Sequence, residues 1–296
     1  MNTTPFSASI PGIFLLGGEL PINRLGYGAM RLTGQPGNFG PYGDWEGGKQ
    51  LLCHAVEQGI NFIDTAEAYG PGTNEDIIAD ALHPYPEGLV IATKGGIHKP
   101  SPDNIQADGR PESLRQGVEG SLQRLKRNRI DLYQLHRPDP KVPFVESIQA
   151  LAKLQQEGKI RHIGVSNVTL AQLKVAQAIV PIASLQNRYS LLDRTHEDIL
   201  NYCATNQIAF IAYGPLGAHP LRQGSPIAQT EGLLAQIVDA HHASSPTQIA
   251  LAWLLHRAPN ILLIPGTTTI SHLEENQKSA QIRLSEAEFH QLNSLQ

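Results

Sequence analysis

Three predicted strands of the sequence each end in a charged or titratable side chain. The strands lie at residues 60–63, 90–93 and 130–135, and they are followed by Asp64, Lys94 and His136. A carboxylate at the end of a buried strand is costly unless a cation pairs with it, and Lys94 is the obvious candidate. Each residue alone could be a helix cap, a surface lysine or a hydrogen-bonded histidine. Three residues in the same position relative to their strands predict that the strand ends converge on one site.

Converging strand ends are the layout of a (β/α)8 TIM barrel, in which catalytic residues stand at the C-terminal ends of several strands. The remaining strands are predicted at residues 25–30, 160–167, 183–189, 208–213 and 261–265. Helices are predicted at residues 45–58, 75–82, 111–126, 143–157, 169–179, 195–205, 229–240, 246–257, 271–278 and 286–294. The strand runs are rich in Val, Ile, Leu and Ala and largely do not alternate, as expected for parallel strands buried on both faces. We therefore predict one α/β barrel domain over residues 1–296, with extra C-terminal helices.

Two glycine-bearing segments add to this barrel. Residues 14–25 read as two short strands around Gly17-Gly18, which predicts an N-terminal β-hairpin that could close the N-terminal mouth of the barrel. Residues 33–48 are rich in glycine and form a long loop after the first barrel strand. Long loops of this kind in compact domains are usually functional or disordered, so this loop is a candidate border of the substrate site.

The composition narrows the class of protein. The 296 residues carry a net charge of −4 at pH 7, which argues against nucleic acid as a main partner. The two cysteines, Cys53 and Cys203, have no paired spacing and fit buried thiols in a reducing compartment. No apolar run reaches the roughly 18 residues of a membrane span, and no signal-peptide pattern is visible. We expect a cytoplasmic protein without a membrane partner, as a monomer or a weak homo-oligomer.

Several common motifs are absent from the sequence. There is no G-x-G-x-x-G after a strand, no G-x-x-x-x-G-K-[ST] and no H-E-x-x-H, which disfavours a Rossmann domain, a P-loop and that class of zinc site. The pair His241-His242 fits a solvated helix end better than a metal site. Residues 164–168 lack the last glycine of a nucleophile elbow. We expect no metal.

Asp64, Tyr69, Lys94 and His136 are interpreted as one proton-transfer constellation. A free tyrosine has a pKa of about 10, too high for efficient acid–base work near neutrality. A nearby Lys94 ammonium would lower the pKa of Tyr69, and Asp64 would hold Lys94 charged and in place. His136 could hydrogen-bond the same substrate oxygen. Such a tyrosine suits proton delivery to a carbonyl oxygen, and because no side chain can deliver a hydride, a cofactor is implied.

The segment Asp64–Gly70 reads DTAEAYG, which matches the D-T-A-x-x-Y-G motif of the aldo-keto reductases. Further matching blocks follow in the family's order at Ala92–Lys94, Leu135–Asp139, Gly164–Asn167, Gln186–Asn187, Ala212–Gly217 and Ile264–Asn276. Together these blocks are highly specific, and they run from about residue 20 to the C-terminus. The chain therefore resembles an aldo-keto reductase.

The resemblance implies a nicotinamide cofactor, usually NADPH, extended across the barrel mouth. Residues implied near the nicotinamide are Gly28, Ala29, Met30 and Asp64, with Ser166, Asn167 and Gln186 on its carboxamide and Tyr213 stacked on its ring. Residues implied near the phosphates are Gly214, Pro215, Leu216 and Gly217 at the pyrophosphate, and Gly266, Thr268, His272, Glu275 and Asn276 around the adenosine phosphate. Core packing is the ordinary alternative for an aromatic residue such as Tyr213.

The sequence departs from the family at the expected 2′-phosphate site. Many members place an arginine at the position of His272 and a lysine or arginine within residues 266–269, where this chain is uncharged. Imidazole does not replace a bidentate guanidinium, so NADH stays open beside NADPH. Arg222 could supply the missing charge, or could be a solvated loop arginine.

Several segments look most similar to a bacterial branch of the family that includes pyridoxal reductases: residues 25–31, 38–41, 161–168 and 260–266. We therefore expect an NADPH-dependent reductase of an aldehyde or ketone, with pyridoxal as the candidate small-molecule substrate and Tyr69 as the proton donor. One alternative is a nicotinamide-sensing regulatory subunit of a membrane channel with little turnover. Another is a barrel lyase or isomerase without nicotinamide, which the cofactor blocks disfavour. Fold and family do not fix the substrate.

Overall fold

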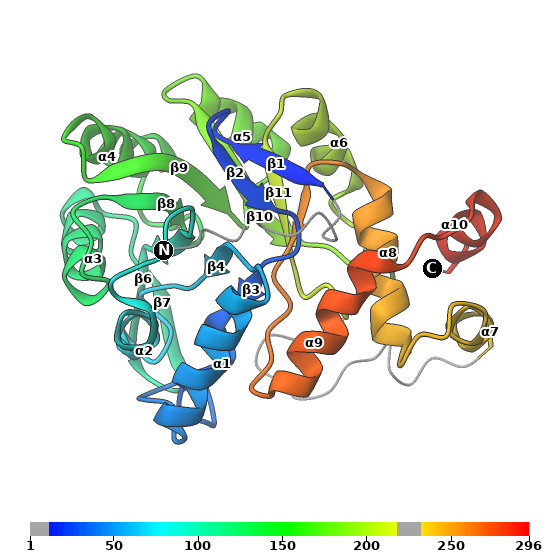
Figure 1. The fold of residues 1–296 in the computed structure, drawn as a ribbon. Helices are drawn as coiled ribbons and strands as arrows, with labels where there is room; N and C mark the ends of the chain where they lie inside the picture. Colours follow the sequence, from blue (N-terminus) through cyan, green and yellow to red (C-terminus); the bar gives the residue numbers. More distant parts are fainter. Residues whose placement is uncertain (1–11, 218–231, 296) are drawn as a thin grey trace.

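The computed structural model describes residues 12–217 and 232–295, and its centre is a barrel of eight parallel strands (Figure 1). The barrel strands are β3 (Tyr27–Gly28), β4 (Phe62–Asp64), β5 (Val90–Gly95), β8 (Ile130–Leu135), β9 (Ile160–Ser166), β10 (Ile182–Arg188), β11 (Ala209–Tyr213) and β12 (Ile261–Leu263). They neighbour one another in chain order, from β3 to β12. The ends meet where Leu25 forms a parallel bridge with Leu263 and the Gly26 amide donates to the Leu263 carbonyl at 2.8 Å. The predicted (β/α)8 barrel is confirmed.

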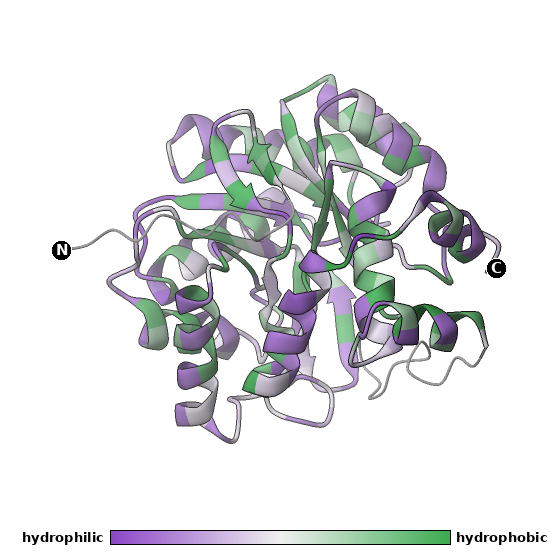
Figure 2. Ribbon diagram, turned by 45° about the vertical axis from the view of Figure 1, so that its right-hand side comes forward, coloured by the Kyte–Doolittle hydropathy of each residue, from purple (hydrophilic) through white to green (hydrophobic). Residues whose placement is uncertain are grey.

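Helices surround the barrel and join its strands (Figure 1). They are α1 (Trp45–Glu57), α2 (Thr73–Leu82), α3 (Pro111–Arg124), α4 (Phe144–Gln156), α5 (Leu170–Gln177), α6 (Glu197–Thr205), α7 (Leu233–Ala240), α8 (Pro246–Arg257), α9 (Ile270–Lys278) and α10 (Glu286–Asn293). Figure 2 shows that these helices carry both hydrophobic and hydrophilic residues, as expected for helices with one face on a core. None of the helices in the described parts of the chain is long and apolar enough to cross a membrane.

The predicted N-terminal hairpin is also present. It consists of β1 (Ile13–Leu16) and β2 (Leu20–Asn23), which pair antiparallel around Gly17 and Gly18. Its buried Leu16 and Ile22 pack in the same cluster as Phe62, Leu132 and Ile211 of the barrel strands. The hairpin therefore contributes to the core at the N-terminal side of the barrel.

Local signals account for several helix boundaries. Thr169 caps α5 in a capping box with Gln172, and Ser285 caps α10 in the same way with Glu288. Gly158 follows α4 at a φ of 77°, a left-handed conformation that glycine adopts without steric cost. Threonine, serine and glycine at these positions are residue types that typically begin or end a helix.

Two elements near the C-terminal mouth differ from the prediction. The first barrel strand covers only Tyr27–Gly28, because the chain turns at once into the 3-10 helix η1 (Ala29–Arg31). A second hairpin, β6 (Ile97–Ser101) paired with β7 (Asn104–Ala107), was not predicted. Its residues are mostly polar and include Pro100 and Pro102, so neither a hydrophobic alternation nor a typical two-residue turn marks it.

Candidate active site

Strand alternation places a polar layer on top of the apolar layer inside the barrel. Successive side chains of a strand point to opposite faces, so Asp64 shares the inner face with Phe62, two residues before it. By the same rule, Lys94 follows the inward Ala92 on β5, and Gln134 follows the inward Leu132 on β8. Polar side chains from three neighbouring strands are thus brought together at the C-terminal end of the barrel.

Lys94 and Asp64 form a buried ion pair. Lys94 Nζ lies 2.5 Å from Asp64 Oδ1, and the two side chains are 0% and 3% exposed. The same ammonium donates to the Thr65 carbonyl at 2.8 Å. The other carboxylate oxygen of Asp64 accepts from Gln186 Nε2 at 2.9 Å and from Gln134 Nε2 at 3.2 Å. Both buried charges are therefore paired and hydrogen-bonded, which is the condition under which such burial is tolerated.

Burial alone would lower the pKa of Lys94, but the charge of Asp64 and the contact with Tyr69 outweigh it and raise that pKa. Lys94 is therefore an ammonium at neutral pH. The ion pair puts Asp64 in the position from which it was expected to hold Lys94 charged and in place.

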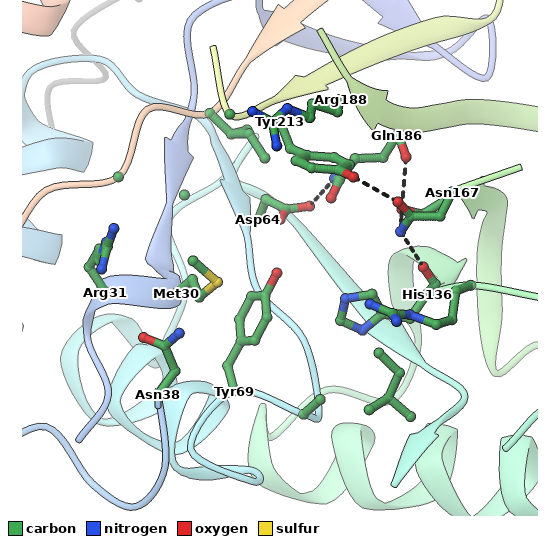
Figure 3. A pocket seen from close by; sticks show the side chains of 18 of the residues that line it. Met30, Arg31, Asn38, Asp64, Tyr69, His136, Asn167, Gln186, Arg188 and Tyr213 are labelled. Atoms are coloured by element: carbon green, nitrogen blue, oxygen red, sulfur yellow. Dashed lines mark hydrogen bonds between the residues drawn. The ribbon is translucent and has the colours of Figure 1, made fainter. Parts of the chain in front are cut away.

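Tyr69 completes the group from the turn after β4. Lys94 Nζ lies 3.4 Å from the Tyr69 hydroxyl and 5.1 Å from its ring centroid. The Tyr69 ring meets the ring of His136 edge-on, with centroids 5.9 Å apart and an interplanar angle of 82°. Figure 3 shows Tyr69, Asp64 and His136 around one cavity.

The net direction of the Tyr69 pKa is opposite to the one predicted. Burial raises the pKa of Tyr69, and the Lys94 charge offsets this only in part. The prediction considered the cation and left out the desolvation of the phenol. Tyr69 is consequently a protonated phenol at neutral pH, with a cation beside its oxygen.

His136 is a neutral imidazole in this site. Burial is the main cause that lowers its pKa well below the usual range, and the charges of Lys94 and Arg137 add to it. Its Nδ1 is buried and has no hydrogen-bond partner among the described residues. A neutral imidazole carries one N–H, so His136 can donate one hydrogen bond into the cavity.

The opposite wall is a hydrogen-bonded set around Asn167. Asn167 Nδ2 donates to the His136 carbonyl at 2.9 Å and to Ser166 Oγ at 3.1 Å, and its Oδ1 accepts from the Tyr213 hydroxyl at 2.8 Å (Figure 3). Ser166 Oγ in turn donates to the Gln186 carbonyl at 2.7 Å. Asn167 has a φ of 56°, a left-handed conformation in which asparagine is among the better tolerated residues. This wall links the ends of β9, β10 and β11.

These groups border a cavity of about 510 Å³. The residues that line it and were predicted for the site are Gly28, Met30, Asp64, Tyr69, His136, Ser166, Asn167, Gln186, Tyr213, Gly214, Pro215, Leu216 and Gly266. Lys94 lies behind the lining and contacts it through Asp64 and Tyr69. The loop at 33–48, the predicted border of the substrate site, contributes Asn38 to the lining of the cavity.

The remaining predicted residues do not line the cavity. Ala29 is fully buried, and Gly217 lies just beyond the lining residues of its loop. The four that lie between β12 and the end of α9 are Thr268, His272, Glu275 and Asn276, of which Thr268 and His272 are exposed. Arg222 lies outside the described residues.

Nine further lining residues were not predicted for the site: Arg31, Ala68, Ile97, Lys99, Ile105, Arg137, Arg188, Ile264 and Pro265. Three come from the unpredicted hairpin β6–β7. Arg137 could have been found, because it directly follows His136 in a motif that marks the end of a barrel strand.

The chain resembles known proteins in sequence and in fold. Residues 24–296 match the model of the Aldo/keto reductase family. The chain is 42% identical over 276 residues to an uncharacterised oxidoreductase of Schizosaccharomyces pombe, covering 93% of this chain and 87% of that one. It is 38% identical over 275 residues to pyridoxine 4-dehydrogenase of Escherichia coli, covering 91% of this chain and 93% of the relative. A Klebsiella pneumoniae aldo/keto reductase in complex with NADP and acetate has the same fold, with a TM-score of 0.80, 26% identity and coverage of 97% and 95%.

Proposed function

The chain belongs to the aldo/keto reductase family and is thus an NADP(H)-dependent oxidoreductase, and from this premise we propose that it reduces an aldehyde or ketone to an alcohol with Tyr69 as proton donor. One observation carries the proposal. The Tyr69 hydroxyl faces a cavity and lies 3.4 Å from a buried ammonium, Lys94, that is itself fixed by Asp64.

The raised pKa of Tyr69 suits an acid. The phenol holds its proton at neutral pH and can give it to the carbonyl oxygen as negative charge develops there. The phenolate left behind would be next to the Lys94 ammonium, which stabilises it. His136, as a neutral imidazole, would donate a hydrogen bond to the same oxygen and orient the carbonyl. NADPH, when bound, supplies the hydride.

The cavity wall fits a nicotinamide cofactor. Ser166, Asn167 and Gln186 present amide and hydroxyl groups that would hold a carboxamide, and the half-buried Tyr213 ring offers a flat surface beside them. Gly28 and Gly266 present backbone to the cavity, so a large ligand can come close. The exposed Thr268 and His272 at the start of α9 would meet the adenosine phosphate, where a helix N-terminus favours an anion. NADP in the Klebsiella pneumoniae relative supports NADPH as the cofactor.

Pyridoxal is the proposed substrate. The supporting observation is the 38% identity, over 91% of this chain, to a relative named pyridoxine 4-dehydrogenase. That name describes the oxidation whose reverse is the reduction proposed here. A screen of carbonyl compounds should therefore begin with pyridoxal, followed by other aromatic aldehydes, both neutral and anionic.

Tyr69→Phe tests the proposed chemistry. The variant should lose turnover of every carbonyl substrate by a factor of at least about 100, a magnitude typical of a lost general acid. Its binding of NADPH, followed by quenching of intrinsic fluorescence, should stay within about twofold of wild type. Retained turnover would refute the role of Tyr69. Tight NADPH binding by the wild type without turnover of any carbonyl would instead favour a nicotinamide-sensing subunit.

A further inference from the structure

The cavity carries an excess of positive charge. Among its described lining residues, the charged side chains are Arg31, Asp64, Lys99, Arg137 and Arg188. Asp64 is the acidic residue among them, and its carboxylate is already paired with the buried Lys94. A cleft with this balance attracts a negatively charged molecule.

Arg31 has an interaction partner in the protein, and so do Arg188 and Lys99. Arg188 Nε lies 2.9 Å from Asp193 Oδ2. Lys99 is 8% exposed, and its ammonium donates to the Gly37 carbonyl at 2.5 Å and to the Asn38 carbonyl at 2.9 Å. These two side chains hold loops around the cavity, so their role is accounted for by the fold.

Arg137 is placed differently. Its side chain is exposed and lines the cavity at the C-terminal end of β8. Within residues 12–217 and 232–295 it makes no hydrogen bond or ion pair. An arginine that faces a cavity without a partner among these residues has its planar, five-donor guanidinium available for a ligand.

The charge of Arg137 acts on Tyr69, His136 and Tyr213. Burial is the main cause that raises the pKa values of Tyr69 and Tyr213, and Arg137 is one of the cations that oppose the rise in both. Tyr69 follows β4 and Tyr213 ends β11, and both border the cavity from different sides (Figure 3). A cation that acts on both, and on the neighbouring His136, is close to the space where a carbonyl substrate would react.

The cavity lining also has apolar side chains. Ile97 and Ile105 line it beside Lys99 of the same hairpin β6–β7, and Ala68 lines it from the turn after β4. They would contact the hydrocarbon or aromatic part of a substrate, between the carbonyl at Tyr69 and a charged group at Arg137.

We propose that this site selects carbonyl compounds that carry a carboxylate or another anionic oxygen group, and that Arg137 is the residue that determines this specificity by binding that group. The proposal rests on the proposed reductase function and adds the substrate class. The guanidinium fork matches two carboxylate oxygens, and charge-assisted bonds of this kind are stronger than neutral ones.

Matched aldehydes test the proposal. The two substrates are 4-formylbenzoate and 4-formylbenzamide, which have nearly the same size and differ in charge. Wild type should show a kcat/KM at least about tenfold higher for the benzoate, as expected for a hydrogen bond to a charged group. Arg137→Met should bring this ratio close to one by lowering kcat/KM for the benzoate, and Arg137→Lys should fall between the two.

The ratio separates specificity from general damage, because a defect in chemistry or folding slows both substrates alike. Arg129→Met is the matched control. Arg129 is an exposed arginine that directly precedes the N-terminal end of β8, whereas Arg137 lies at the C-terminal end, so this variant should leave the ratio unchanged. Equal kcat/KM values for the two substrates in wild type would overturn the proposal. So would an Arg137→Met variant that keeps the wild-type ratio, or one that loses affinity for NADPH and slows both substrates equally.

A binding measurement covers the case in which no aldehyde is turned over. Calorimetric titration of the NADP-bound protein with benzoate and with benzamide reads the anion site directly. Benzoate should bind wild type at least about tenfold more tightly than benzamide, and Arg137→Met should remove the difference. Without turnover the reductase proposal fails while the anion site stands, and equal binding of the two ligands refutes the anion site itself.

Discussion

Glu67→Gln should make the stability of the protein less sensitive to pH, because the fold raises the pKa of the Glu67 carboxyl. The residue lies between Asp64 and Tyr69, and its amide donates to the Lys94 carbonyl at 3.0 Å. Burial and the nearby charge of Glu75 raise the pKa of the Glu67 carboxyl from the ordinary 4.5 to about 7. Ionising this carboxyl therefore costs free energy in the native state that it does not cost in the unfolded chain.

The magnitude follows from the two pKa values. They differ by about 2.5, which corresponds to at most about 3 kcal/mol. Between pH 4.5 and 7 the native state binds more protons at this site than the unfolded state, so this site's contribution to the free energy of unfolding falls as the pH rises through that window. The destabilisation is absent below pH 4.5 and complete above pH 7. An amide at position 67 cannot ionise and removes it.

Equilibrium urea unfolding of wild type and Glu67→Gln at pH 5 and pH 8 measures the effect. The free energy of unfolding of the variant, relative to wild type, should be higher at pH 8 than at pH 5 by up to about 3 kcal/mol. Glu87→Gln, which replaces an exposed carboxylate, is the control for surface charge. A difference between Glu67→Gln and wild type that is the same at both pH values would refute the reasoning, because it would mean that the carboxyl is ionised in the native state across this range.

Three other variants test individual contacts in and around the cavity. Asp64→Asn leaves the buried Lys94 ammonium without its carboxylate, and should lower the free energy of unfolding by roughly 3–5 kcal/mol in urea titrations. Lys99→Met removes the donor to two loop carbonyls and should cost about 1–3 kcal/mol, with faster hydrogen exchange confined to residues 33–44. Gly266→Ala would place a methyl group 2.8 Å from the Gly28 carbonyl oxygen, so NADPH binding by fluorescence titration should weaken while Tyr69-dependent chemistry on bound substrate is kept. Unchanged urea midpoints for the first two, or unchanged NADPH affinity for the third, would contradict these readings of the contacts.

The convergence of Asp64, Lys94 and His136 could be predicted because it depends on two local properties of the sequence. Strand alternation decides which side chains face inward, and the common direction of parallel strands decides that their ends meet. Neither property requires knowledge of contacts between distant segments. The same reasoning explains why the hairpin β1–β2, with its Gly17-Gly18 turn, could also be predicted.

The sign of the Tyr69 pKa could not be predicted in this way. It depends on how fully the phenol is desolvated against the cation beside it, and desolvation is set by packing around the cavity. The cavity wall formed by the hairpin β6–β7 was missed for a similar reason. Ile97, Lys99 and Ile105 lie in a short polar hairpin whose position is fixed by contacts of Lys99 with a loop about 60 residues earlier in the chain. No pattern within the hairpin itself marks that contact.

The ion pair of Lys94 and Asp64 is better explained by the proposed reaction than by stability. A well-packed apolar pair at these positions would often be at least as stable, because desolvating two charges costs several kcal/mol before their attraction offsets it. The fold nevertheless surrounds this pair with amides: both Gln134 and Gln186 donate to the Asp64 oxygen that Lys94 does not use. This arrangement leaves the ammonium fixed 3.4 Å from the Tyr69 hydroxyl. A phenol with a raised pKa keeps its proton until a substrate oxygen takes it, and the fixed cation then stabilises the phenolate at the moment it forms. The buried charge is therefore useful in the state that follows proton transfer, which is why its cost in the resting protein is tolerated.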